Sequence, residues 1–313
     1  VVRFDPSTPA ANAGADQDLC TVGGSAATTL AGNAPVAPAT GSWTLVSGTA
    51  IITTPTSATT TVTGMTPGTV VLRWTISNGP CTPPTTSDEV TIRVFSAAAP
   101  AANAGPDQDL CAPVATVTLA ANAAVAPASG TWTVVSGSGT FANANSPTTT
   151  VSGMGIGSNI YRWTINNGPC AGAITSDEVR IRLFDPAIAA ANAGADQQLC
   201  GSTSTNLAGS AVNAPATGTW SLVSGSGTIV DPANPAASIT DLAIGANVFR
   251  WTVSNGPCGS TSDEVTILRF DPNNAAANAG PDQSICTPIA PNVVVLAGSA
   301  VIFPATGQWT VVS

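Results

Sequence analysis

One motif, which occurs three times at near-constant spacing, constrains the fold of this chain more than any other feature. It is an Arg-Trp-Thr segment that leads into an Asn-Gly-Pro-Cys turn, and its copies are Arg73–Cys81, Arg162–Cys170 and Arg250–Cys258. An internal period has to be read before chain length, because each copy of a period folds into one structural unit. The 313 residues therefore predict a tandem array of repeats, each roughly 89 residues long, rather than two ordinary domains.

The segment around each Arg-Trp-Thr alternates between apolar and polar side chains. In the first copy Val70, Leu72, Trp74 and Ile76 fall on one face, with Arg73 and Thr75 among the residues of the other. This period of two predicts an antiparallel strand with one buried and one wet face. No segment has a helical period. About seven short strands in a unit of this length predict an all-β fold, an array of immunoglobulin-like antiparallel sandwiches.

Two tryptophans in each repeat are expected to form the core between the two facing sheets. Each Arg-Trp-Thr tryptophan follows the tryptophan of a Gly-x-Trp motif by about 31 residues, a spacing that suits neighbouring strands of one sandwich. The predicted core residues are Trp43, Trp74, Trp132, Trp163, Trp220, Trp251 and Trp309.

A phenylalanine that ends the last strand of each repeat marks the repeat boundaries. Phe4, Phe95, Phe184 and Phe270 each precede an Asn-Ala-Gly segment by the same number of residues. A connector of fixed length that is rich in Ala and Pro is expected to hold neighbours in a set orientation; a plain extended connector is the alternative. The predicted organisation is the last strand of a preceding repeat (1–5), repeat 1 (10–95), repeat 2 (101–184), repeat 3 (190–270) and the first part of a truncated repeat 4 (276–313).

Cysteines recur at two fixed places in every repeat, and this predicts one disulfide per repeat. Such usage is typical of an oxidising compartment. A metal site is the weaker reading, because the pairs lack histidine and any Cys-x-x-Cys spacing. The predicted bonds are Cys20–Cys81, Cys111–Cys170 and Cys200–Cys258, with a partner for Cys286 beyond Ser313.

These motifs together resemble a known family. Ala-Asn-Ala-Gly-Pro-Asp-Gln, then Gly-x-Trp, then Arg-Trp-Thr with Asn-Gly-Pro-Cys and Asp-Glu-Val, is similar to the PKD-like, immunoglobulin-like repeats of very large Bacteroidetes surface proteins. Among these are gliding-motility adhesins and cell-surface fibres exported by the type IX system. The chain departs from eukaryotic PKD domains, since Thr-Leu-Val-Ser follows Trp43. The resemblance implies a secreted, cell-surface adhesion protein.

Composition excludes several functions. The chain has no histidine and no lysine, so neither a Ser-His-Asp triad nor a Schiff-base lysine is available, and we expect no enzyme activity. Its net charge is −9, which argues against nucleic acid as a partner. It has no apolar run long enough to insert into a membrane.

Acidic residues on either side of each connector offer a possible calcium site, although no cofactor is required. Carboxylates at a domain junction can share a hard cation and stiffen the joint. Turn formation is the preferred reading, since Asp-Pro and Asp-Gln bond their own backbone. A further acid, Glu89, is expected to face Arg73 across a hairpin. The calcium candidates are Asp16, Asp18, Asp107, Asp109, Asp185, Asp196, Asp271 and Asp282.

The predicted function is structural: a stalk or fibre segment of an extracellular bacterial surface adhesin or filament. The partners would be neighbouring repeats of the same chain and other copies in a fibre, because a chain with only 8% charged residues has little surface charge to resist association. The alternative is an array that binds a glycan or surface polymer, for which exposed aromatic platforms would be needed. Glycosylation of the Thr-rich surface is a further option.

Overall fold

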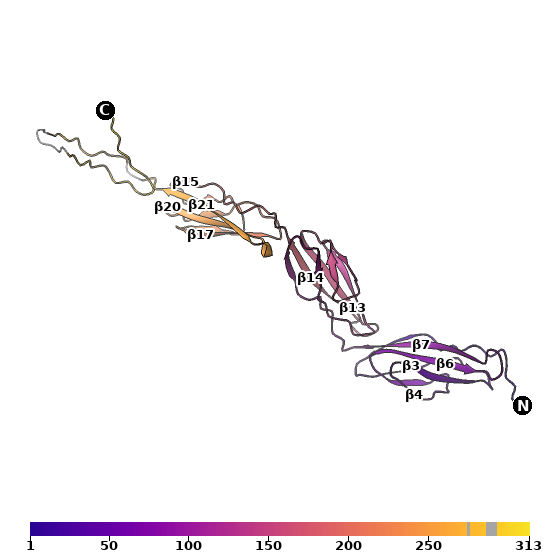
Figure 1. Cartoon of the computed structure of the whole chain (residues 1–313). Helices are drawn as coiled ribbons and strands as arrows, with labels where there is room; N and C mark the ends of the chain where they lie inside the picture. Colours follow the sequence, from indigo (N-terminus) through magenta and orange to yellow (C-terminus); the bar gives the residue numbers. More distant parts are fainter. Residues whose placement is uncertain (274–275, 286–292) are drawn as a thin grey trace. The chain divides into compact units, whose positions relative to one another are not determined.

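The computed structural model describes residues 1–273, 276–285 and 293–313. These residues divide into two compact units, and each is described by itself. One unit contains residues 1–108 and 114–182, and the other contains residues 109–113 and 183–313. Within the described residues the strands form three groups of seven, and the one helical element is a short 3-10 turn. Figure 1 labels the main strands. The predicted bond of Cys286 lies outside the described residues.

The first group of strands builds a sandwich of two sheets. A four-stranded sheet has the order β1-β7-β6-β3, and a three-stranded sheet has the order β2-β5-β4. The strands are β1 (Gln17–Thr21), β2 (Ala26–Thr29), β3 (Thr40–Ser47), β4 (Ile51–Ile52), β5 (Thr61–Met65), β6 (Gly68–Ser77) and β7 (Thr85–Ser96).

The second group repeats this arrangement, with sheets β10-β13-β14-β8 and β11-β12-β9. Its strands are β8 (Gln108–Cys111), β9 (Thr116–Thr118), β10 (Ser129–Ser136), β11 (Thr140–Phe141), β12 (Thr150–Ser152), β13 (Gly157–Asn166) and β14 (Ile174–Phe184).

The third group has sheets β15-β21-β20-β17 and β16-β19-β18. Its elements are β15 (Gln197–Cys200), β16 (Thr205–Asn206), β17 (Thr217–Ser224), β18 (Thr228–Val230), β19 (Ser238–Thr240), β20 (Gly245–Ser254), the 3-10 turn η1 (Gly256–Cys258) and β21 (Ser260–Phe270). The all-β, immunoglobulin-like tandem fold predicted from the sequence is confirmed.

A pair of tryptophans from neighbouring strands forms the centre of each sandwich. Trp43 lies directly opposite Trp74 in the β3–β6 register, and the ring centroids are 5.1 Å apart. The equivalent ring pairs are 5.2 and 5.0 Å apart in the other two sandwiches. Gly41 makes room for this packing, because a Cβ there would lie 2.2 Å from Cζ2 of Trp74. Six of the seven predicted core tryptophans are thus buried as expected.

Trp309 is the exception, since its predicted place in a core is wrong. It is 53% exposed, and none of the described residues after Phe270 lies in a strand. In each of the three groups of strands, the equivalent tryptophan packs against a second tryptophan on a neighbouring strand of the same sheet. The segment of Trp309 does not pair into a sheet in the described part of the chain, so the ring is left uncovered.

One pairing in the first and third sandwiches is parallel and places the two ends of a repeat side by side. β1 runs parallel to β7, and Cys20 lies opposite Phe95 in this register. In the third group β15 runs parallel to β21, with Cys200 opposite Phe270. The first cysteine of a repeat therefore lies at the end of its last strand, which the alternation of residues alone does not predict.

Candidate functional site: the joint between repeats

Two disulfides connect the repeats to one another. Cys20 is bonded to Cys170, with a Cα–Cα distance of 5.1 Å and a sequence separation of 150 residues. Cys111 is bonded to Cys258, with 5.0 Å and 147 residues. In both bonds the first cysteine of one repeat joins the turn cysteine of the next. The predicted pairs Cys20–Cys81, Cys111–Cys170 and Cys200–Cys258 are wrong, and Cys81 and Cys200 are free thiols.

The length of the last strand explains why the two cysteines of one repeat do not bond. Cys20 lies opposite Phe95, near the end of β7, whereas Cys81 lies in the turn before β7 begins. A strand of 12 residues spans about 40 Å at the usual rise per residue. Disulfide formation needs Cα atoms within about 7 Å. The sandwich therefore holds its own two cysteines apart and presents each one to a neighbour.

A phenylalanine ring packs against the glycine of the Asn-Gly-Pro-Cys turn at each of these disulfides. Gly168 has a φ of +59°, and a Cβ there would lie 2.6 Å from Cζ of Phe95. Gly256, with a φ of +52°, stands in the same relation to Phe184. Both the left-handed backbone and the close ring require a residue without a side chain. The last strand of one repeat is thereby packed on the turn of the next.

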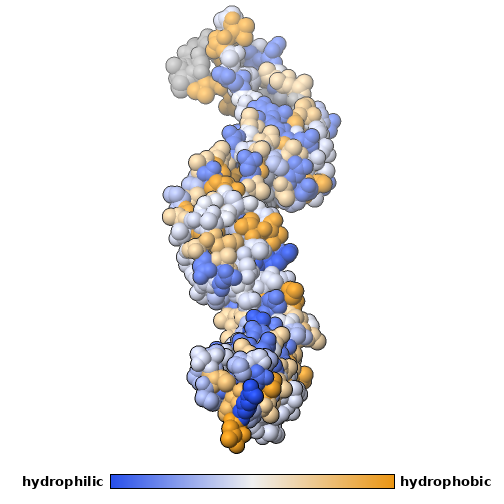
Figure 2. All heavy atoms as spheres, turned by 90° about the vertical axis from the view of Figure 1, so that its right-hand side faces the viewer, coloured by the Kyte–Doolittle hydropathy of each residue, from blue (hydrophilic) through white to orange (hydrophobic). Residues whose placement is uncertain are grey.

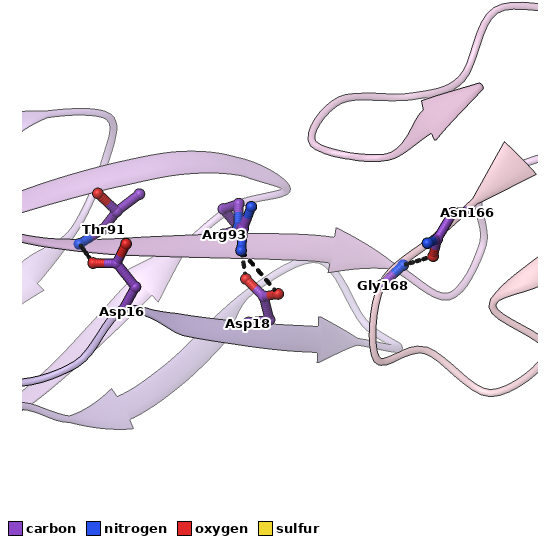
Figure 3. A network of polar contacts seen from close by, with 6 residues as sticks. All are labelled: Asp16, Asp18, Thr91, Arg93, Asn166 and Gly168. Carbon is purple, nitrogen blue, oxygen red and sulfur yellow. Dashed lines mark hydrogen bonds and ion pairs between the residues drawn. The ribbon is translucent and has the colours of Figure 1, made fainter. Parts of the chain in front are cut away.

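The asparagine of each turn adds a hydrogen bond to the chain just beyond this phenylalanine. Asn167 Nδ2 donates to the carbonyl oxygen of Ser96 at 2.8 Å, and Asn255 Nδ2 donates to that of Asp185 at 2.7 Å. The disulfide, the ring on glycine and this amide bond together make up what we call the joint. Figure 3 shows the turn beside the end of the last strand, with Gly168 N donating to Asn166 Oδ1.

A third turn has the same non-covalent contacts without a disulfide. Phe4 packs on Gly79, whose φ is +55°, and a Cβ there would lie 2.6 Å from the ring. Asn78 Nδ2 donates to the carbonyl oxygen of Asp5 at 2.8 Å. Residues 1–5 thus occupy the position that a last strand occupies in the complete joints.

The acidic residues after each connector hold β-strands together. Figure 3 shows Asp16 accepting a bond from the backbone N of Thr91, and Asp18 paired with Arg93. These contacts tie the start of β1 to β7. The same backbone contact recurs at Asp107 and Asp196, which accept from Arg180 N and Thr266 N at 2.8 Å. Asp109 lies on β8.

The acidic residues before each connector form turns. Oδ1 of Asp5, Asp185 and Asp271 accepts from the backbone N two residues on, at 2.8, 2.8 and 2.9 Å. Because the hydroxyl and the amide of Ser7 both donate to Asp5, the pKa of this carboxyl is below its ordinary value. Across the described part of the chain, Asp282 included, no group of three potential metal ligands comes together. These described residues therefore offer no cluster of ligands that would support the calcium hypothesis.

The predicted pair of Arg73 and Glu89 is confirmed and recurs in every sandwich. Arg73 Nη2 lies 2.6 Å from Glu89 Oε1 across the β6–β7 register. The equivalent pairs are Arg162 with Glu178 and Arg250 with Glu264. All are near half-exposed, so each stabilises the fold by about 0–1 kcal/mol. The Asp-Glu segments thus have structural partners, and the site of interest is the joint.

The joint residues were all visible in the sequence, but their grouping was not predicted. The repeated phenylalanine marked a boundary, and the repeated glycine marked a turn. Their fixed positions at opposite ends of the repeat were the signal that one meets the other in the neighbouring unit.

Comparisons with known proteins give no family. No protein-family model and no curated protein matches the chain. Similar solved structures include an I-band fragment of titin, at 13% identity and a TM-score of 0.37 over 84% of this chain and 99% of that one. A complex of Dpr2 and DIP-Theta immunoglobulin domains has 12% identity and a TM-score of 0.44, over 84% and 100%. The PKD domain from the KIAA 1837 protein has 22% identity and a TM-score of 0.25, over 31% and 96%.

All three TM-scores are below 0.5, so the fold assignment rests on the strand order and the tryptophan cores. None of the helical residues described forms a helix long and apolar enough to cross a membrane.

Proposed function

We propose that this chain is a load-bearing segment of an extracellular stalk or fibre, built from β-sandwich repeats that are covalently locked to their neighbours. The observation that carries this proposal is the inter-repeat disulfide. Every complete joint is crossed by two covalent connections, one through the peptide connector and one through the disulfide. An array that only had to display its repeats would need the peptide connector alone.

Two separate connections restrict motion in a way that one does not. A single connector lets a domain swivel about it, whereas a second link at another point removes most of that rotation. The packing of phenylalanine on glycine and the asparagine hydrogen bond lie at the same joint. Covalent and non-covalent contacts therefore both restrict the motion of one repeat against the next. We expect the connector to be part of a stiff joint rather than a flexible linker.

The compartment and the biological setting follow from chemistry and from the resemblance. Stable disulfides belong to oxidising environments, which favours secretion. The resemblance to PKD-like repeats of Bacteroidetes surface proteins supports the finer proposal of a bacterial cell-surface adhesin, exported by the type IX system and of the gliding-motility type.

Exposed apolar pairs at one position in every repeat favour lateral association with other copies. Leu45 and Val46 are 42% and 43% exposed at the end of the edge strand β3, and Val134–Val135 and Leu222–Val223 have the same exposures on β10 and β17. On the face in Figure 2, apolar and weakly polar residues are mixed, and strongly hydrophilic residues are scattered. Such a surface is compatible with packing of chains side by side.

The alternative, a glycan-binding array, lacks a comparable observation. From residue 1 to residue 270 every aromatic side chain is buried or half-buried. Tyr161 is fully buried in its sandwich, and its hydroxyl donates to Ser138 O at 2.6 Å. These described repeats therefore present no exposed aromatic platform for a sugar ring.

Two measurements test the proposal. Peptide mapping without reductant is expected to find Cys20 linked to Cys170 and Cys111 linked to Cys258. Small-angle scattering is expected to show stiffly connected domains that become more flexible when the disulfides are reduced. A freely jointed particle under oxidising conditions would contradict the stalk function, and electron microscopy of the native cell surface would then show no fibre of this protein.

A further inference from the structure

The spacing of cysteines along the chain gives the disulfides a consequence beyond the single joint. Cys170 is followed by Cys200, and Cys81 is followed by Cys111, each after about 30 residues of largely extended chain. The first stretch contains β14, the connector and β15, and the second contains β7, the connector and β8. Each stretch therefore runs from the turn cysteine of one repeat to the first cysteine of the next.

Combined with the disulfides, these stretches form two continuous covalent tracks. The first track passes from Cys20 through the disulfide to Cys170 and along the chain to Cys200. The second passes from Cys81 along the chain to Cys111 and through the disulfide to Cys258. At the joint between repeats 1 and 2 the first track crosses by disulfide and the second by peptide. At the next joint these roles are exchanged.

Most of each sandwich is on neither track. The stretch from the first cysteine to the turn cysteine of a repeat, such as Cys20 to Cys81, contains both core tryptophans and the whole three-stranded sheet. Opening these residues does not lengthen either track. The part of a repeat that contains its two core tryptophans is thus separate from the shortest covalent route.

We propose that the oxidised array bears tension along these two tracks and cannot lengthen by unfolding its sandwiches. Without disulfides, each repeat that opened under force would release roughly 89 residues, or about 300 Å of chain. With the tracks closed, the last strand and connector carry the load in a form that is already extended. This inference rests on the proposed stalk function for its biological use, but the covalent route is a property of the chain itself.

Force spectroscopy between two chosen residues tests the tracks. Handles would be attached at Val22, which is 90% exposed, and at the exposed Ser202, in a chain whose other cysteines Cys81, Cys200 and Cys286 are serine. The oxidised chain should reach a limit of about 34 residues, or about 120 Å. After reduction the same handles should separate by about 180 residues, or about 600 Å.

A matched pair of variants identifies the bond responsible. Replacing Cys111 and Cys258 by serine should leave the short limit unchanged, because the first track does not use that disulfide. Replacing Cys20 and Cys170 removes the same number of bonds but should lengthen the limit about fourfold, to about 145 residues on the remaining route. Guanidinium without reductant should unfold the sandwiches and leave the wild-type limit where it was.

A limit of about 120 residues would mean a disulfide between Cys111 and Cys170 within one repeat and would overturn the tracks. Any lengthening of the oxidised wild type with sandwich unfolding would do the same. A short limit combined with the absence of a native fibre would instead contradict the proposed function and leave the tracks standing.

Discussion

The turns at Asn78–Cys81 and Asn167–Cys170 have one sequence but differ in their covalent state. In both, a phenylalanine packs on the glycine and the asparagine amide bonds a carbonyl beyond it. Only the second turn is bonded to a first-strand cysteine. The non-covalent half of the joint therefore forms without the disulfide, and the disulfide adds the first strand of the neighbouring repeat to a contact that already exists.

The largest expected effect comes from removing the bond that distinguishes the two turns. Replacing Cys20 and Cys170 together by serine should lower the free energy of unfolding by roughly 5 kcal/mol on the chain-entropy model for a loop of this length. Chemical denaturation of the oxidised wild type and of the double variant measures this loss. Cys81→Ser is the matched control at the other turn and should change stability very little. Equal losses in both variants would mean that the disulfide does not set the difference.

The next effect concerns the ring that both turns share. Phe95 is 6% exposed in a complete joint, so Phe95→Ala should cost about 3–4 kcal/mol. Phe4 is only half-buried, so Phe4→Ala should cost well under half as much. Thermal unfolding of the two variants gives the ratio. Similar losses would show that the disulfide does not strengthen the packing of the ring.

A smaller effect tests why glycine occupies the turn. Gly168→Ala places a Cβ against the ring of Phe95 and should cost about 2–4 kcal/mol, the sum of backbone and overpacking terms. Gly153 has a similar φ of +69° but no atom within 4 Å, so Gly153→Ala should show only the backbone cost of about 1–2 kcal/mol. Urea titration compares the two. Identical costs would show that the ring of Phe95 adds nothing to the cost of a side chain at position 168.

The smallest effect reports whether damage at the joint reaches the neighbouring core. Tyr161 is the only tyrosine, and burial raises its pKa to about 12. A raised pKa in the folded state means that the stability from the neutral phenol is present below the ordinary value near 10. That stability is lost as the pH rises from about 10 toward 12. An absorbance titration should give the same high pKa in the Cys20/Cys170 double variant, and a fall toward 10 would show that the core of repeat 2 depends on the joint.

The sequence predicted the sandwiches well because their determinants are local. Alternation placed Trp74 and Leu72 inside, and the cross-strand pair of Arg73 with Glu89 followed from the hairpin. The cysteine pairing was different. In a regular repeat the first cysteine and the turn cysteine recur at a constant separation, both within one unit and between neighbouring units. The spacing therefore does not indicate which two cysteines are bonded. Deciding between Cys81 and Cys170 as the partner of Cys20 required the parallel register of β1 on β7, which no periodicity records.

The opposite-end placement of the two cysteines also affects how such a chain matures. During synthesis, Cys170 follows Cys20 only after about 150 more residues, whereas Cys81 is synthesised much earlier. A folded first sandwich keeps Cys81 out of reach at the far end of β7, so folding has to come before oxidation. The second repeat must then fold as well before its turn meets Cys20. Correct pairing of each disulfide therefore requires that two consecutive repeats have folded.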